Sequence, residues 1–433
     1  MEFKEMYLID CVNDIIDYRG KTPKKLKDNW SEDGDYRAIS AKNIKNMNLV
    51  NQNSMNKAKA SLYKKWMKKE IDKGDILLTS EAPLGETLYW DFEEKIILSQ
   101  RVFGLKANNE IVNSKYLFAY MQTPFFKHEL FARESGTTVT GIRRKELEKV
   151  IIKVPSMYIQ NYIGKIIYNI NYKINNNNKI IANLEELSQT LFKRWFVDFE
   201  FPDENGNPYK SSGGEMIDSE LGEIPKNWNV LTINDFADDL IITGKTPSTK
   251  NKDNYSEKGI PFLTIPDMHT DVFSLNTIKY ISEVGIEKVK NKIIPENSLC
   301  VSCIATPGLV SITSSETLTN QQINSFTPKK NDLYYLYFYI KNMKKYIEDL
   351  GSGGSATLNL NKTQFSKIKI IRPINDLLKK FHKCVDSNFK IILTKQKENL
   401  KLQELRDTLL PKLMFGELEI PDDVEVNTDE LSI

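Results

Sequence analysis

The amino-acid sequence contains a tandem duplication, and this limits the possible folds more than any other feature. Gly20-Lys21-Thr22-Pro23 recurs as Gly244-Lys245-Thr246-Pro247, an offset of 224 residues, and 39–44 faces 263–268 at the same offset. Farther along, Gln100 aligns with Gln321 and 116–120 with 335–339; from Gly136 and Gly354 onward the offset is constant at 218. Similarity that stays in register over such lengths predicts two copies of one structural unit.

Each copy has two parts of different character. Residues 1–156 and 225–374 mix short β-branched or aromatic runs with Gly, Asn and Pro breaks, which is typical of α+β globular domains. Residues 157–199 and 375–415 contain almost no Gly and no Pro before Pro411. In the first copy, apolar residues recur there at steps of four and three, as expected of a long helix with a coiled-coil seam. The residues of this seam are Ile163, Ile167, Ile170, Ile174, Ile181, Leu184 and Leu191. A helix of 40 residues would be ~60 Å long.

Polar residues interrupt both seams. Asn177 and Ser188 occupy apolar positions in the first copy, and the second copy has several more. The second seam keeps Phe381, Val385, Ile392, Leu402 and Leu409 but includes Asn388, Lys395, Asn399 and Arg406. This pattern predicts looser or offset packing for the second helix. Residues 200–224 read as a turn-rich linker and residues 416–433 as a solvated acidic tail.

Length and composition exclude several classes of protein. A chain of 433 residues is too long for one ordinary core, and 40% hydrophobic with 27% charged residues indicates folded domains. The formal charge is only +2, so any affinity for nucleic acid must come from local clusters. No apolar run approaches the ~20 residues of a membrane helix, and the acidic start differs from a signal peptide. With four cysteines and no disulfide pattern, we expect a cytoplasmic protein without a membrane partner.

Motifs for catalysis are incomplete. Gly-Lys-Thr lacks the earlier glycine of a phosphate loop, and Pro23 or Pro247 follows where that loop would enter a helix. These turns are better explained as loops in which glycine supplies an unusual backbone angle and Lys and Thr face outward; ordinary solvated turns remain the alternative. Cys300 and Cys303 have no second cysteine pair and read as core residues of a strand. The three histidines form no ligand pair, so the sequence predicts no metal site and no catalytic residues.

Basic residues cluster at related places in both copies, which favours contact with a polyanion over a merely solvated face. Gln and Arg side chains near these clusters can form paired hydrogen bonds with base edges. The candidate DNA-binding residues are Lys21, Thr22, Lys24, Lys64, Lys65, Gln100, Arg101, Thr137, Thr138, Arg143, Arg144, Lys245, Thr246, Gln321, Gln322, Ser352, Ser355 and Lys362.

These features together resemble the specificity subunit of a type I restriction-modification system, over nearly the whole chain. The matching segments are the Gly-Lys-Thr-Pro turns, 74–77, the Gln100 and Gln321 segments, the Gly-rich loops before Leu147 and Phe365, Pro155 with Gln160 and Ile163, 221–228, and 405–414. The second copy departs from the pattern at Asn297-Ser298, where Gly-Asp is usual, and at Leu378, where Gln is usual.

The resemblance implies an α+β fold with two tandem target-recognition domains, residues 1–156 and 225–374. Two long antiparallel coiled-coil helices, 157–199 and 375–415, would separate them with pseudo-two-fold symmetry. Each domain would read one half of a split, asymmetric double-stranded DNA site. The implied partners are two methyltransferase subunits and ATP-driven motor-nuclease subunits. S-adenosylmethionine, ATP and Mg²⁺ would bind those partners, and this chain would hold no cofactor.

Two other classes of function compete with this interpretation. One is a stand-alone nuclease or methyltransferase with an unrecognised motif. The other is a protein-interaction scaffold whose globular parts do not touch DNA.

Overall fold

The structure is a computed structural model that describes residues 2–136, 140–269, 271–352, 359–418 and 420. Its contacts divide the chain into two units. Unit 1 comprises Met1–Asn175 and Leu402–Ile433, and unit 2 comprises Asn176–Lys401. The divisions fall inside the two long helices, α6 (Met157–Phe192) and α12 (Asn375–Met414), so each helix contributes residues to both units.

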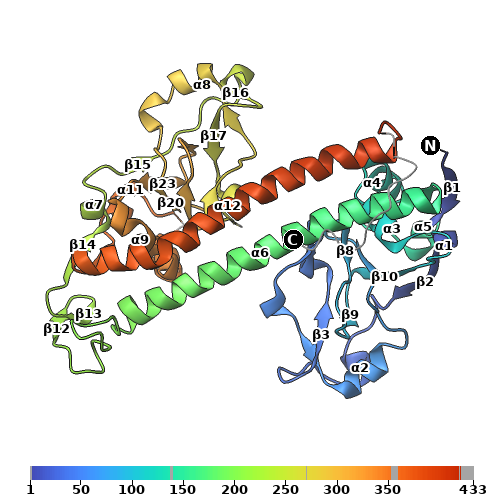
Figure 1. Ribbon diagram of the computed structural model, residues 1–433, viewed down its shortest axis with the longest axis horizontal. Helices are drawn as coiled ribbons and strands as arrows, with labels where there is room; N and C mark the ends of the chain where they lie inside the picture. The colour runs from blue at the N-terminus through green and yellow to red at the C-terminus, as the bar shows by residue number, and fades with distance from the viewer. Residues whose placement is uncertain (1, 137–139, 270, 353–358, 419, 421–433) are drawn as a thin grey trace. The chain divides into compact units, whose positions relative to one another are not determined.

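Unit 1 is built around a four-stranded antiparallel sheet in the order β2-β10-β7-β8 (Figure 1). Its strands are β2 (Val12–Asp17), β7 (Ile76–Ser80), β8 (Leu84–Tyr89) and β10 (Val102–Ala107). A smaller sheet joins β6 (Lys57–Ala58), β3 (Tyr36–Ile39) and β9 (Ile97–Leu98), of which β3 and β9 are parallel. The remaining strands form the pairs β1 (Lys4–Tyr7) with β11 (Ile151–Val154) and β4 (Ile44–Lys45) with β5 (Asn48–Leu49).

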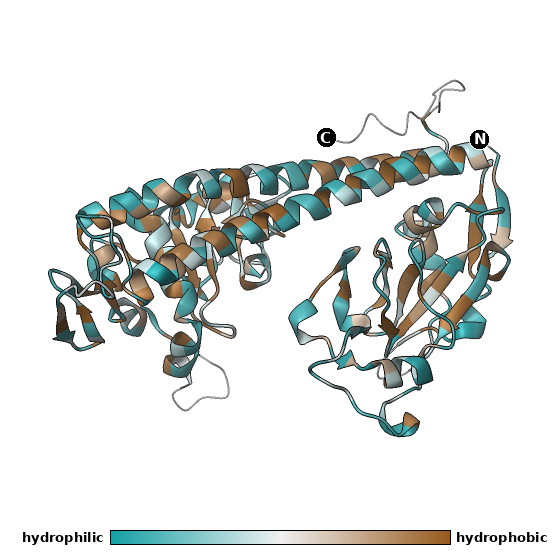
Figure 2. Cartoon of the chain, turned by 60° about the horizontal axis from the view of Figure 1, so that its bottom comes forward, coloured by the Kyte–Doolittle hydropathy of each residue, from teal (hydrophilic) through white to brown (hydrophobic). Residues whose placement is uncertain are grey.

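The β7 strand shows why its sequence is apolar without alternation. Ile76 and Leu78 belong to the core that the helices cover, whereas Leu77 belongs to the core on the other side. Successive side chains of a strand point to opposite faces, so a strand covered on both faces needs a continuous apolar run. The two central strands, β7 and β10, are accordingly mostly apolar, and Figure 2 shows hydrophobic residues along strands of this unit. The shorter helices of unit 1 are α1 (Leu8–Cys11), α2 (Ala60–Trp66), α3 (Ser114–Tyr120), α4 (Pro124–Phe131) and α5 (Arg144–Leu147).

Unit 2 repeats this topology. Its main sheet has the order β15-β23-β20-β21-β18, and a second sheet has the order β16-β19-β17-β22. The strands are β15 (Ile242–Thr243), β16 (Tyr255–Ser256), β17 (Ile260–Leu263), β18 (Phe273–Ser274), β19 (Tyr280–Ile281), β20 (Leu299–Ser302), β21 (Val310–Thr313), β22 (Leu318–Thr319) and β23 (Ile323–Phe326). A separate pair is formed by β14 (Asn229–Thr232) with β24 (Lys369–Arg372).

The strand register confirms the predicted duplication. Val102 pairs with Thr79 in unit 1 as Ile323 pairs with Ser302 in unit 2. The parallel pair β3 and β9 recurs as β17 and β22. The helices of unit 2 other than α6 and α12 are α7 (Ile233–Phe236), α8 (Glu283–Glu287), α9 (Leu333–Asn342), α10 (Lys344–Gly351) and α11 (Lys362–Ser366).

The segment predicted as a turn-rich linker contains a hairpin of β12 (Met216–Ser219) and β13 (Gly222–Pro225). Phe201 is buried and stacks on Tyr209 at 4.6 Å and on Trp228 at 5.3 Å between ring centroids. These aromatic contacts attach the segment to the core of unit 2.

Within unit 2, α6 and α12 run in opposite directions, and the polar residues of their seams bond to each other. Asn177 Nδ2 donates to Asn399 Oδ1 at 2.9 Å, and Asn388 Nδ2 donates to Ser188 Oγ at 3.1 Å. In unit 1, Arg406 on α12 donates from Nη1 to Asn171 on α6 at 3.1 Å. At Asn388 and Asn399 the polar residues of the second seam each meet a polar residue of the first seam, whereas looser or offset packing of the second helix stays a prediction.

Replacing Asn177 with Leu is expected to lower the free energy of unfolding by about 1–3 kcal/mol, because Asn399 Oδ1 loses its donor in a buried site. Replacing both residues, Asn177→Leu with Asn399→Leu, should cost less than the two single changes added together, since neither of these two buried positions is then left with an unpaired amide. The change at Asn399 also removes its hydrogen bond to Asn178 Oδ1 at 2.8 Å, but Asn178 is exposed and can bond to water. Urea unfolding of the three variants measures this coupling. Strictly additive losses would contradict a mutual Asn177–Asn399 interaction.

Among the described residues, no helix is both long enough and apolar enough to cross a membrane.

Candidate DNA interface

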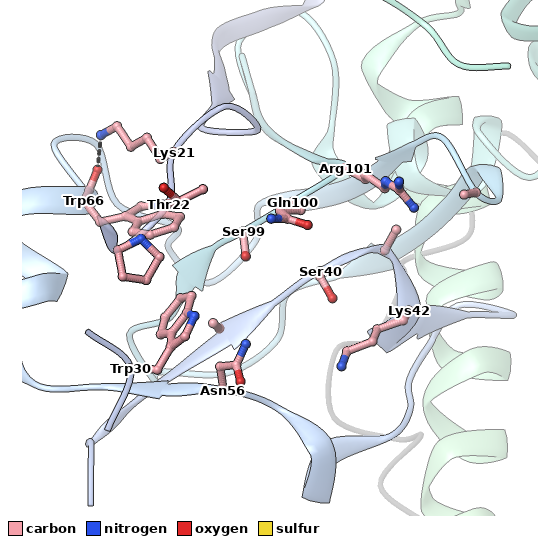
Figure 3. A pocket seen from close by; sticks show the side chains of 14 residues that line it. Lys21, Thr22, Trp30, Ser40, Lys42, Asn56, Trp66, Ser99, Gln100 and Arg101 are labelled. Carbon is pink, nitrogen blue, oxygen red and sulfur yellow. Dashed lines mark hydrogen bonds between the residues drawn. The ribbon is translucent and has the colours of Figure 1, made fainter. Parts of the chain in front are cut away.

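A pocket of about 290 Å³ lies in unit 1 and gathers several of the predicted residues (Figure 3). Three chain segments form most of it: the Gly-Lys-Thr-Pro turn, the end of β3, and the turn between β9 and β10. Its lining residues are Lys21, Thr22, Pro23, Trp30, Ala38, Ser40, Ala41, Lys42, Asn56, Trp66, Ala82, Ser99, Gln100 and Arg101.

The parallel pairing of β3 with β9 explains why these distant segments meet. Ser99 donates its backbone N–H to the Ile39 carbonyl at 2.8 Å, and Ala41 donates to the Gln100 carbonyl at 3.2 Å. The ends of both strands therefore lie side by side, which places Ser40 and Gln100 on the same pocket.

Lys21 lines the pocket, and its side chain also contacts neighbouring residues of unit 1. Its Nζ donates to the Trp66 carbonyl at 2.5 Å and lies 4.0 Å from the centre of the Tyr18 ring. Burial, and secondarily the charge of Lys68, lowers the Lys21 pKa below that of an exposed lysine. The side chain is thus held against the wall of the pocket and contributes positive charge there.

The other predicted basic residues of this region differ in exposure and in whether they form an ion pair. Lys24 and Lys64 are exposed. Lys65 is half-exposed and forms an ion pair with Asp28 at 2.8 Å. The Thr22 hydroxyl accepts from the backbone N–H of Lys25 at 3.3 Å.

Gln100 and Arg101 are both exposed at the pocket. Arg101 Nε lies 3.1 Å from Glu81 Oε1, an ion pair that restrains the guanidinium. Within the described part of the chain, the Gln100 side chain has no hydrogen-bond partner, so both ends of its amide are available to a ligand.

The equivalent segments also meet in unit 2. Thr246 Oγ1 donates to Gln321 Oε1 at 2.7 Å, and the Lys245 backbone N–H donates to the Thr319 carbonyl at 2.9 Å. Gln322 Oε1 accepts from Asn320 Nδ2 at 2.9 Å. The turn with Gly-Lys-Thr and the segment with Gln therefore form one cluster in each unit.

The prediction that glycine supplies an unusual backbone angle in these turns is wrong. Neither Gly20 nor Gly244 has a backbone angle in the left-handed region. At Gly244 a Cβ would lie 2.2 Å from the Asn320 carbonyl, so this position requires the absence of a side chain instead. Gly20 has open space around it.

A family model described as "Type I restriction modification DNA specificity domain" matches the chain twice, over residues 9–186 and 225–403. The chain belongs to this family of specificity subunits. The two matches cover most of both repeats, including every described segment of the clusters around Gln100 and Gln321.

Curated relatives and a solved structure agree with this assignment. The specificity subunit is 35% identical over 408 residues to the type I restriction enzyme HindI specificity subunit of Haemophilus influenzae, covering 81% of this chain and 88% of the relative. It is 26% identical over 424 residues to the MjaIX specificity subunit of Methanocaldococcus jannaschii, covering 93% and 91%. Its fold resembles the crystal structure of a type I system S subunit from M. genitalium, with a TM-score of 0.58, 15% identity and coverage of 98% and 97%.

Other predicted residues of the specificity subunit lie outside the pocket. Arg143 and Arg144 are exposed at the start of α5, where Arg144 pairs with Glu148 at 2.9 Å. Ser352 is exposed and donates to the Asp349 carbonyl at 2.6 Å, and Lys362 is exposed at the start of α11. Thr137, Thr138 and Ser355 lie outside the described residues.

The structure also adds residues that the sequence did not single out. Ser40, Lys42, Asn56 and Ser99 bring polar groups to the pocket, and Trp30 adds an aromatic ring. The repeat itself carried a usable signal for Ser40 and Lys42, since both lie in the duplicated segment 39–44.

Cys300 and Cys303 are core residues of the specificity subunit, as predicted, whereas Cys384 is exposed. Cys300 and Cys303 are buried, and burial raises their thiol pKa values to about 12 and about 11. Across the residues that the structure describes, no group of three or more His, Cys, Asp or Glu side chains is arranged to hold a metal ion.

Proposed function

We propose that this specificity subunit recognises a bipartite, asymmetric double-stranded DNA sequence and catalyses no reaction itself. It would direct a partner adenine-N6 methyltransferase and ATP-dependent motor-nuclease subunits to that sequence. S-adenosylmethionine, ATP and Mg²⁺ would be held by those partners. The observation that carries this proposal is the meeting of the Gly-Lys-Thr turn with the Gln segment in both units.

The clusters in the two units have the chemistry for DNA recognition. Lysines near each cluster can neutralise phosphates and release counterions, which gives affinity without sequence choice. Amide and guanidinium groups at the same place can form paired hydrogen bonds with base edges, which gives choice. We assign the first role to Lys24, Lys64, Arg143, Arg144, Lys245 and Lys362 and the second to Gln100, Arg101, Gln321 and Gln322.

The differences between the clusters support an asymmetric site. Unit 1 presents Arg101 and Lys42 at its pocket, whereas Gln322 and Pro266 occupy the aligned positions in unit 2. Since base choice depends on the donors and acceptors offered, the two units should select different half-sites.

Domain organisation follows from the same proposal. Residues 1–156 and 225–374 would each recognise one half-site, and α6 and α12 would form an antiparallel coiled-coil spacer with pseudo-two-fold symmetry. Support comes from the opposed direction of the helices within unit 2 and from the buried seam residues Ile163 and Ile167 in unit 1.

A competition experiment tests this function. With methyltransferase partners present, one split duplex should compete for binding at least about 10³-fold better than scrambled duplexes of the same length. Mapping methylated adenines on genomic DNA should return the same split sequence. Equal competition by all duplexes would favour the scaffold alternative, and methyl transfer or cleavage by the isolated chain would favour an enzyme.

A further inference from the structure

Arg101 has a backbone conformation that arginine rarely adopts. Its φ angle is +65°, in the left-handed region where a side chain crowds the following carbonyl. Glycine would avoid this cost. Residues held in such conformations concentrate at functional sites, because the surrounding structure must stabilise them. Eleven other described non-glycine residues also have a positive φ, so the conformation of Arg101 gains its meaning from the contacts that hold it.

The surrounding backbone fixes where the Arg101 side chain begins. The Arg101 carbonyl accepts from the Ser80 N–H at 2.8 Å, on β7. The preceding Gln100 carbonyl accepts from the Ala41 N–H at 3.2 Å, just beyond β3. These bonds hold the turn between β9 and β10 from two sides, so the Arg101 Cα is anchored to both sheets of unit 1.

Glu81 fixes the other end of the side chain. Its carboxylate lies 3.1 Å from Arg101 Nε, while about half of the arginine side chain stays exposed. For the described residues, no further hydrogen bond or ion pair engages the two terminal nitrogens of Arg101. Arg101 thus leaves its terminal N–H groups available at the pocket that Gln100 also lines.

The same position in unit 2 lacks the arginine–glutamate ion pair. The Cys303 N–H donates to the Gln322 carbonyl at 2.8 Å, just as the Ser80 N–H donates to Arg101, so Gln322 is the structural equivalent of Arg101. Ile304 follows Cys303 where Glu81 follows Ser80. In unit 2, Gln322 therefore stands in place of the arginine and Ile304 in place of its carboxylate partner.

We propose that Arg101 reads a guanine in the half-site bound by unit 1 and that Glu81 is its positioning residue. This inference rests on the proposed function. The two free N–H groups of a guanidinium match the O6 and N7 acceptors of guanine in the major groove, which no other base presents together. A point charge such as lysine cannot reproduce this planar pair.

The test uses the complex with methyltransferase subunits and the mapped target. Arg101→Gln, which introduces the residue of unit 2, should reduce selectivity for one G·C pair by about 10- to 100-fold and leave the other half-site unchanged. Replacing that guanine with 7-deazaguanine, which lacks the N7 acceptor, should weaken binding of the unchanged complex but not of the Arg101→Gln complex.

Glu81→Gln and Glu81→Asp separate positioning from structure. Glu81→Gln should lose part of the preference for the same base pair without a change in melting temperature, and Glu81→Asp should restore part of it. Arg37→Gln is the matched control, because Arg37 also bonds a glutamate in unit 1, with Nε 2.7 Å from Glu94, yet does not line the pocket. Its base preference should equal that of the unchanged complex.

Two outcomes would overturn the inference. An equal loss of affinity of the Arg101→Gln complex for all sequences, with a salt dependence reduced by about one phosphate, would show that Arg101 contacts the DNA backbone. An unchanged base preference would show that Arg101 reads nothing. Failure of the proposed function looks different, since the unchanged complex would then show no sequence preference at all.

Discussion

Exchanging residues 1–156 for the same segment of another specificity subunit changes one half of the methylated sequence and leaves the other half as it was. This result is expected because unit 1 has its own sheets, cores and pocket, none of which uses residues 225–374. Selectivity for the original half-site should fall by about 10³-fold or more, the usual margin between specific and non-specific binding. Sequencing of methylated adenines in cells that carry the hybrid subunit measures it.

The reciprocal exchange of residues 225–374 is the matched control and should alter only the other half. Both exchanges keep α6 and α12, so the hybrid retains the apolar residues that meet in unit 1, among them Ile163 on α6 and Leu413 on α12. A change in both half-sites after one exchange would contradict independent recognition by the two domains.

Replacing Phe381 with Ala should lower the free energy of unfolding by about 3–5 kcal/mol, the usual cost of emptying a buried aromatic site. Phe381 on α12 is fully buried in unit 2 and meets three aromatic residues at the end of α6 and in the π-helical turn that follows it, Lys193–Val197. Its ring centre lies 5.0 Å from that of Phe196, 6.0 Å from Trp195 and 6.3 Å from Phe192. The aromatic cluster thus attaches the start of α12 to the end of α6.

Urea unfolding of the full chain, followed by circular dichroism, measures the loss. Leu240→Ala serves as the control in the same unit, because Leu240 is 72% exposed and its truncation should change stability by less than about 0.5 kcal/mol. If Phe381→Ala and Leu240→Ala unfolded at the same urea concentration, the cluster would not hold the two helices together.

The sequence predicted the duplication because similar segments recur in the same order, and it predicted the long helices because apolar residues recur at steps of four and three. It could not predict how the seams fit. Asn177 and Asn399 each appear as a defect when one helix is considered alone, and only the antiparallel register shows that they bond to each other. Likewise, the turn composition of 200–224 gave no sign of a packed segment, in which Phe201 stacks on Tyr209 and on Trp228, the latter beyond the turns.

Some residues that line the pocket could be found from the sequence for a similar reason, although their contact with DNA stays a prediction. Thr22 and Gln100 were identified from short segments that recur, and the structure brings both to one pocket. Asn56 and Trp30 have no distinctive sequence context and reach the pocket only through tertiary folding. The lysine clusters predicted positive charge but not the direction of each side chain. Nothing in the sequence indicates that Lys65 pairs with Asp28 or that Lys21 bonds the Trp66 carbonyl.

The division of the long helices between the units has a consequence for synthesis on the ribosome. Unit 1 needs the end of α12, because Leu410 and Leu413 pack with Ile163 and Ile167 in its core. The 226 residues of unit 2, Asn176–Lys401, are translated between these two contributions. All residues of unit 2 are therefore translated before unit 1 receives its last core residues. Until then, the apolar residues of 1–175 that pack with Leu410 and Leu413 lack these partners in the nascent chain.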